Sequence, residues 1–154
     1  MVAINNTTTE FKKIDEKFLK NVVKKILLKE KISAKINLSI ALVDAGEIKK
    51  INKQYRRENS PTDVLSFGEL IEKKQKPEYF SESEIIICPS VVQKNAKQAK
   101  ELFEKELARV LAHAMLHLLG YEHEEGGVEA KKMFQKQEEY LSLFNFNTKK
   151  INNN

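Results

Sequence analysis

Several residue types are scarce in this chain, and each scarcity excludes something. The 154 residues include one cysteine, Cys88, so no disulfide can form within the chain, as expected for a protein of the reducing cytoplasm. Without a C-x-x-C pair, Cys88 is expected to be a small core residue. No run of about eighteen apolar residues occurs, so we expect no membrane span. The N-terminal sequence also lacks the apolar segment of a secretory signal.

The basic residues exceed the acidic ones. Lysine and arginine number 27 against 22 acidic residues, which gives a net charge of +5 and a pI of about 9.1. This excess suits an anionic partner such as nucleic acid, although the abundance of lysine, asparagine and isoleucine also indicates a compositional bias of the source. Only three basic residues are arginines, and two of them, Arg56 and Arg57, are adjacent.

Hydrophobic periodicity predicts three strands and five helices. Apolar residues alternate strictly from Ile32 to Leu42, which is typical of a half-buried strand, and they recur at helical spacing from Phe11 to Lys29. The expected strands cover residues 32–42, 62–68 and 84–88, and the expected helices cover 11–29, the segment between Asp44 and Ser60, 89–99, 101–119 and 128–144.

The remaining segments are polar. Residues 1–10 and 146–154 are expected to be flexible tails, and residues 69–82 a loop or weak hairpin. We find no internal repeat and no second core. The chain is therefore predicted to form one domain, residues 1–154, of the α/β or α+β class with a small mixed sheet.

The three histidines of the chain, His113, His117 and His123, all lie within eleven residues. The first two are four apart on a predicted helix, so they share one face about one turn apart. Gly120 then allows a turn that brings His123 back. The pattern H-x-x-x-H-x-x-G-x-x-H has the spacing of the metzincin zinc motif. Three imidazoles with one open position favour a catalytic zinc, although nickel, copper and iron also bind imidazole.

One position departs from the zinc protease motif. Such proteases use the glutamate after the first histidine as general base, and here that residue is Ala114. Peptide hydrolysis of the usual zincin type is therefore not expected. Glu122, Glu124 and Glu125 flank His123, and they are expected either to be exposed or to support a ligand.

The motifs as a whole resemble those of the YbeY-type bacterial endoribonucleases, also called rRNA maturation factors. The family signature, roughly H-G-x-L-H-L-x-G-Y-D-H, appears here as "HAMLHLLGYEH". A second signature, N-x-x-Y-R followed by T-D-V-L-S-F, appears as "NKQYRRENSPTDVLSF", and a C-terminal "MF…E" pattern as "MFQKQEEY". The chain departs at Ala114, at Glu122, and at Ser83-Glu84, where the family has Gly-Asp before the metal helix.

The resemblance implies an α+β fold: a single domain with a small mixed four-stranded β-sheet covered by helices and a zincin-like metal helix. It also implies a cytoplasmic, metal-dependent endoribonuclease that binds one Zn²⁺ per chain. Its substrate would be single-stranded RNA, and its role the 3′-end maturation of small-subunit ribosomal RNA and ribosome quality control. Its partners would be ribosomal RNA and the small ribosomal subunit, with neither membrane nor DNA expected.

Chemistry assigns a role to one arginine. A zinc held by three imidazoles lowers the pKa of its bound water from about 15.7 towards 7, and phosphoryl transfer also needs positive charge near the phosphoryl oxygens. Arg56 occupies the family's Y-R position and is the expected phosphate clamp, with a structural ion pair as the alternative. Asp63 is expected either to orient a ligand or Arg56, or to serve a turn. No residue is assigned as general base, and Glu84 and Glu122 are given no role.

Two other functions remain open at this stage. The chain could be a ribosome assembly factor with a structural metal, which would need a fourth protein ligand such as Cys88 or a nearby glutamate. It could also be a metallohydrolase of another substrate, with Ala114 arguing against a peptide.

Overall fold

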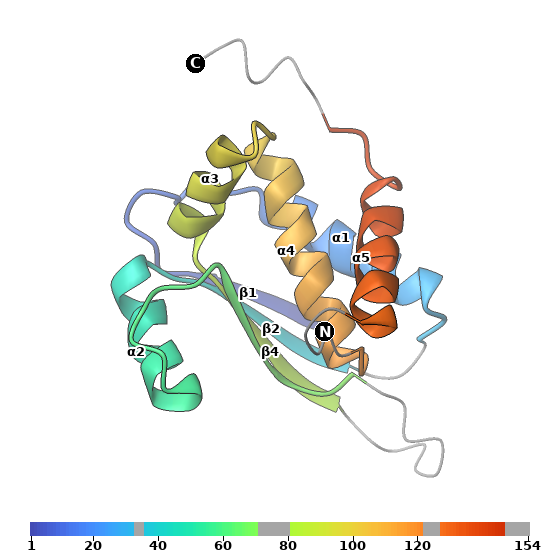
Figure 1. Ribbon diagram of the computed structural model, residues 1–154, viewed down its shortest axis with the longest axis horizontal. Coiled ribbons are helices and arrows are strands. Elements are labelled where there is room, and N and C mark those ends of the chain that lie inside the picture. The colour runs from blue at the N-terminus through green and yellow to red at the C-terminus, as the bar shows by residue number, and fades with distance from the viewer. Residues whose placement is uncertain (33–35, 71–80, 122–126, 147–154) are drawn as a thin grey trace.

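The alternating segment forms the centre of a mixed sheet. Strand β2 (Ile36–Leu42) buries every second side chain, and it pairs in parallel with β1 (Val2–Asn6) and β4 (Ser81–Ile87). Strand β3 (Val64–Gly68) pairs antiparallel with β4, so the order across the sheet is β1-β2-β4-β3 (Figure 1). The computed structural model describes residues 1–32, 36–70, 81–121 and 127–146.

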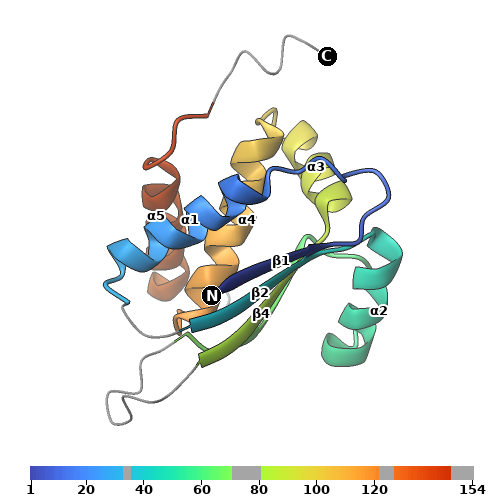
Figure 2. The same ribbon diagram turned by 180° about the vertical axis from the view of Figure 1, so that it is seen from behind.

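Helices cover both faces of this sheet. On one face lie α1 (Glu16–Lys29), α3 (Pro89–Gln98), α4 (Phe103–Leu118) and α5 (Val128–Leu141), whereas α2 (Ala45–Arg56) lies on the other (Figures 1 and 2). Local signals set their starts. Asp15 accepts a hydrogen bond from the backbone of Phe18 at the start of α1, and Pro89 occupies the first turn of α3. Within the described ranges, none of the helices combines the length and apolarity needed to cross a membrane.

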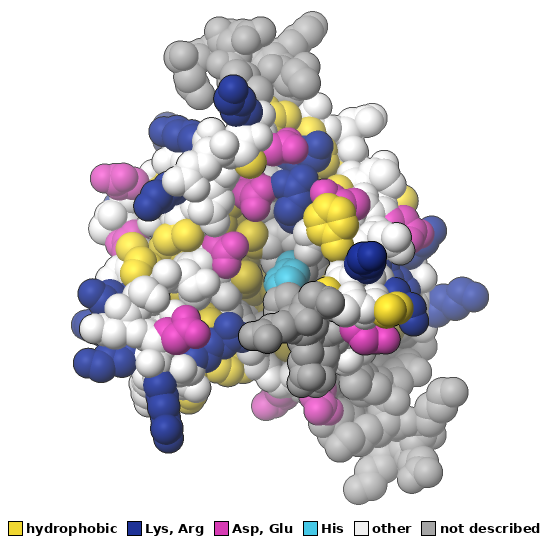
Figure 3. Space-filling view, in the orientation of Figure 1, with side chains coloured by type: hydrophobic (Ala, Val, Ile, Leu, Met, Phe, Trp, Pro, Cys, Tyr) yellow, Lys and Arg dark blue, Asp and Glu magenta, His cyan; other side chains and the backbone are white. Residues whose placement is uncertain are grey.

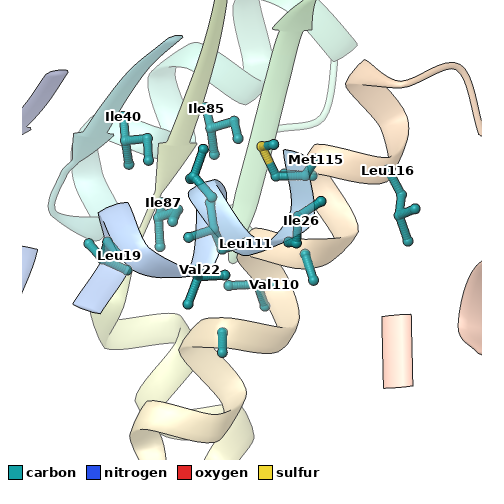
Figure 4. Packing of buried hydrophobic residues seen from close by; sticks show 14 of the residues in the cluster. Leu19, Val22, Ile26, Ile40, Ile85, Ile87, Val110, Leu111, Met115 and Leu116 are labelled. Carbon is teal, nitrogen blue, oxygen red and sulfur yellow. The ribbon is translucent and has the colours of Figure 1, made fainter. Parts of the chain in front are cut away.

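The main core lies between the sheet and the four-helix face. Ile40, Ile85 and Ile87 point from the strands toward α1 and α4, where they meet residues such as Leu111 and Met115 (Figure 4). Nine of the sixteen residues of α4 are buried, which makes it the central helix of the fold. A smaller cluster between the sheet and α2 contains Val43, Ile48, Leu65, Ile86 and the free cysteine Cys88. As expected, Cys88 is a core residue.

The structure corrects one expectation outright. Residues 1–10 are not a flexible tail: residues 2–6 form β1, and Thr8 is buried. Val2 and Ile4 face the main core, and the backbone of Val2 lies opposite Leu38. The alternation of Val2 and Ile4 with Ala3 and Asn5 is the signal that marks this strand.

Other boundaries shift by a few residues. Helix α1 begins at Glu16 rather than Phe11, and β4 begins at residue 81, inside the expected loop. Most of the expected loop, residues 71–80, and most of the expected C-terminal tail, residues 147–154, lie outside the described residues. Phe146, the first residue of that expected tail, packs its ring against that of Phe18. The expected α+β class, with a mixed four-stranded sheet in one domain, is confirmed.

Candidate active site

A cleft of about 330 Å³ opens between β3, the end of α2 and the facing sides of α4 and α5. It is lined by Arg56, Asp63, Glu106, Arg109, His113, His117 and Gln137, among others. In the space-filling view a histidine side chain reaches the surface in a hollow of this face, with acidic and basic side chains around it (Figure 3). Both described histidines and the predicted arginine therefore line one cavity.

His113 and His117 meet at their ring edges. They are one turn apart on α4, their ring planes are inclined by 82°, and their Nε2 atoms lie 3.1 Å apart. Both side chains are half-buried, because the rest of this helix surface packs on the core. Two nitrogen lone pairs at this separation repel each other unless a proton or a metal ion lies between them. The two nitrogens therefore either share a hydrogen bond or converge on a metal ion.

The other nitrogen of His113 is held by α5. Its Nδ1 lies 3.0 Å from the Oε1 atom of Gln137, a buried side chain. A carboxamide oxygen can only accept, so Nδ1 carries the hydrogen and donates it. In a neutral ring this leaves the Nε2 atom of His113 unprotonated and directed toward His117, which is the form that binds metal.

An ion-pair network lies one helical turn before His113 on α4. Arg109 bonds to Glu106 on its own helix and reaches Glu138 on α5 at 3.3 Å. Burial lowers the pKa of the Arg109 guanidinium, but the hydrogen bonds to Glu138 and Glu106 outweigh it and raise the pKa above its ordinary value. Arg109 is thus a fixed charge that joins α4 to α5.

Arg56 lies at the end of α2, exposed at the mouth of the cleft. Among the described residues it makes no ion pair, so the structure offers no support there for the alternative of a structural bridge. The adjacent Arg57 ends the helix in the left-handed conformation with φ of 58°. Arg56 lines the cleft, whereas Arg57 does not.

A buried asparagine shapes the return from α2 to β3. Asn52 is 2% exposed, and its side-chain amide donates to the carbonyl of Ser60 at 2.9 Å. The backbone carbonyl of Asn52 accepts from the backbone N–H of Arg57. These bonds fix the turn after α2, so that Arg56 and Asp63 reach the same cleft. The N-x-x-Y-R pattern contains this asparagine, but its sequence alone assigns it no role.

Two described carboxylates line the cleft. Glu106 is bonded to Arg109, whereas Asp63 accepts only a long hydrogen bond, 3.3 Å, from the hydroxyl of Thr62. The main chain of Asp63 has a separate part, since its carbonyl accepts from the backbone of Cys88 at 2.8 Å. The carboxylate of Asp63 therefore remains available to a ligand in the cleft.

Other sequence candidates lie elsewhere or are not described. Ala114 is buried and lines the cleft, so the place of a protease glutamate holds only a methyl group. Glu84 is exposed and opposite Phe67 in the sheet, and it does not line the cleft. His123 and Glu122 lie outside the described residues, within which no group of three or more histidine, cysteine, aspartate or glutamate side chains is placed to hold a metal.

The chain matches a known family over nearly its whole length. The family model of "Endoribonuclease YbeY" matches residues 3–145. The chain belongs to this family. Proteins named endoribonuclease YbeY from Thermotoga neapolitana and Malacoplasma penetrans are both 41% identical to it, over 82% and 85% of this chain and 80% and 85% of their own.

A further relative and a solved structure are also similar to this chain over most of its length. The protein of that name from Thermosipho melanesiensis is 38% identical over 88% of this chain and 92% of its own. The solution structure of TM1509 from Thermotoga maritima superimposes with a TM-score of 0.59 at 35% identity, and covers 92% of this chain and 87% of that one. The family model thus covers residues 3–6 of β1, which the sequence patterns had missed, together with all described residues of the cleft.

Proposed function

We propose that this YbeY family member is a zinc-dependent endoribonuclease that cleaves single-stranded RNA. We further propose that it acts in the cytoplasm on ribosomal RNA of the small subunit, in 3′-end maturation and ribosome quality control. The observation that carries the proposal is the convergence of His113, His117 and Arg56 on one cleft. Family membership supports the endoribonuclease activity.

The described donors suit a zinc ion. The imidazoles of His113 and His117 face each other through their Nε2 atoms, and imidazole nitrogen is a usual ligand of zinc. The Nδ1 of His113 is engaged by an amide oxygen, as is usual for a metal-binding histidine. His113 and His117 would hold the ion, with His123 as the proposed third ligand. A zinc ion bound there supplies Lewis acidity and makes water nucleophilic at neutral pH.

The residues of the chain then divide the remaining work. Arg56 would grip the phosphodiester through its planar fork and stabilise the charge that develops on the phosphoryl oxygens. Asp63 lies in the same cleft, where its carboxylate accepts one long hydrogen bond from Thr62, and it would take the proton of the attacking water. Glu106 is less suited to this, because its carboxylate is already engaged by the guanidinium of Arg109.

The structural-metal alternative loses support from the geometry. Cys88, one of its candidate fourth ligands, is buried in the smaller core cluster, and its sulfur lies 3.2 Å from the hydroxyl of Ser90. It does not line the cleft. The described glutamate of the cleft, Glu106, is bonded to Arg109.

Cleavage assays test the proposal directly. The purified protein, loaded with zinc, is incubated with a single-stranded RNA, the same RNA in a duplex, and a single-stranded DNA of equal sequence. We expect cleavage of the first alone, loss of it with a chelator, and recovery with added zinc. Cleavage that is indifferent to chelator would overturn the zinc dependence, and equal cleavage of the duplex would overturn the strand preference. A precursor of small-subunit rRNA, mapped at its 3′ end, tests the proposed role.

A further inference from the structure

Three consecutive residues of α5 tie it to separate points around the histidine pair. Lys136 donates to the hydroxyl of Tyr121 at 2.7 Å, Gln137 accepts from His113 at 3.0 Å, and Glu138 pairs with Arg109 at 3.3 Å. These contacts connect α5 to the metal helix and to the residue just beyond Gly120, where the chain leaves it.

We infer that Gln137 is a positioning residue that fixes the ring orientation and the tautomer of His113, and that α5 is the element that holds this ligand ready for metal. The inference rests on the proposed zinc site and deepens it. Gln137 itself touches neither metal nor substrate in this proposal. It acts through the single hydrogen bond to Nδ1.

Burial gives this contact its energetic weight. Gln137 is 7% exposed, so its amide oxygen has little access to water and needs the imidazole N–H as a partner. In return, the ring of His113 cannot rotate about its Cβ–Cγ bond without breaking the hydrogen bond to Gln137. Because Nδ1 is committed to donation, the unprotonated nitrogen of the neutral ring is Nε2, which lies toward His117.

The neighbouring ion pair sets the register of the two helices. Arg109 precedes His113 by one turn on α4, and Glu138 follows Gln137 on α5. The pairs therefore run in opposite directions, as in an antiparallel helix pair. A slide of α5 that moved Gln137 away from His113 would also break the partly buried Arg109–Glu138 pair, whose arginine is 18% exposed.

The amide brings no charge of its own. A carboxylate at this position would hold the same hydrogen bond but would offset part of the cation's positive charge, whereas the carboxamide of Gln137 leaves it undiminished. The site thus gains orientation without losing electrophilicity. Because a carboxylate would keep the hydrogen bond to His113, Gln137→Glu is the variant in which metal binding should be retained.

The test compares zinc affinity by competition with a chromogenic chelator in the full chain and three variants. Gln137→Met keeps length and volume but removes the acceptor, and we expect about 10- to 100-fold weaker zinc binding. Gln137→Glu should bind at least as tightly as the original chain. Gln135→Met makes the same change at an exposed position of α5 and should bind normally. Nitrogen NMR of the histidine rings in the metal-free protein should show Nδ1–H for His113 in the original chain and a mixture in Gln137→Met.

The outcomes separate the two proposals. If the original chain binds no zinc, the proposed function fails. If the original chain and Gln135→Met bind zinc and Gln137→Met binds equally well, the positioning role is wrong. That role is equally wrong if Gln137→Glu binds as weakly as Gln137→Met, because a general packing defect would then explain both. Urea unfolding of each metal-free variant identifies any variant that does not fold. If Gln137→Met does not fold, ring NMR of the folded Gln137→Glu chain decides: Nδ1–H for His113 supports the positioning role, and a mixture of tautomers contradicts it.

Discussion

The Nε2 atoms of His113 and His117 face each other at 3.1 Å from successive turns of one helix. Nine buried residues hold α4 in the core, so core packing fixes the backbone positions from which the two rings project. Both rings are half-buried at the cleft and lie off the side of this helix that packs in the core. A variant that removes one ring should therefore act on metal binding more than on the fold.

Removal of the second ring is the most direct test of the metal site. His117→Ala should lose stoichiometric zinc, because the two nitrogens no longer converge, while its far-ultraviolet circular dichroism stays helical. Metal content after gel filtration measures this, with the exposed Lys132→Ala variant as control. Full zinc occupancy in His117→Ala would refute the assignment.

The two adjacent arginines form a matched pair. Arg56→Ala should lower RNA cleavage by about a hundredfold or more with zinc content unchanged, since one charge contact to the transition state is lost. Arg57→Ala, at a position outside the cleft, should cost far less. Single-turnover cleavage rates decide the matter, and equal losses in the two variants would remove the special role of Arg56. Arg56→Lys should stay impaired, because lysine cannot grip phosphate bidentately.

Asp63 is tested by an isosteric change. If its carboxylate takes the proton of the attacking water, Asp63→Asn should retain zinc and lose about 10² to 10⁴ in cleavage rate. Glu58→Gln, at an exposed position nearby, serves as the control. A normal rate in Asp63→Asn would contradict the catalytic role of the side chain and leave Asp63 with its backbone contact, in which its carbonyl accepts from the N–H of Cys88.

The alanine in the metal helix is expected to stabilise it. Ala114→Gly restores the glycine of the family pattern and should lower the free energy of unfolding by about 1 kcal/mol, the usual cost of glycine inside a helix. Zinc affinity should hardly change. Urea denaturation measures the loss, and Ala112→Gly, also buried on α4, gives the reference value. A more stable Ala114→Gly chain would contradict this interpretation of the departure.

Two glycines should respond in opposite ways to alanine. Gly68 has φ of 98°, and a Cβ there would lie 2.5 Å from the carbonyl oxygen of Glu82, so Gly68→Ala should cost more than about 1–2 kcal/mol. Gly46 lies in α2, where a Cβ would meet nothing within 4 Å, so Gly46→Ala should be neutral or stabilising by up to about 1 kcal/mol. Thermal unfolding of both variants checks the contrast.

The sequence predicted the elements with strong periodicity. Helix α4 is long, is followed by Gly120 with φ of 94°, and carries the histidines at fixed spacing, so its position and the pairing of His113 with His117 followed from the pattern. The alternation in β2 likewise identified a strand. In both cases a local repeat reports the burial that tertiary packing imposes.

The features that the sequence did not reveal depend on contacts with residues distant in the chain. Strand β1 has five residues, two of them asparagine, and its burial exists only because β2 lies beside it. Gln137 is an ordinary polar residue of an amphipathic helix, and no spacing in the sequence reveals that its amide meets a histidine 24 residues earlier. Asn52 was visible in a motif, but its buried bond to Ser60 was not.

The place of β1 also orders events during synthesis. Residues 2–6 precede α1 in the chain, whereas their parallel partner, residues 38–42, is synthesised only after the whole of α1. Two parallel strands need such a crossover connection between them, so the apolar side chains of β1 have no sheet partner until β2 has been synthesised. This edge of the sheet can therefore be completed only after β2 has been synthesised, so a segment that the sequence patterns assigned to a tail depends for its structure on residues translated after it.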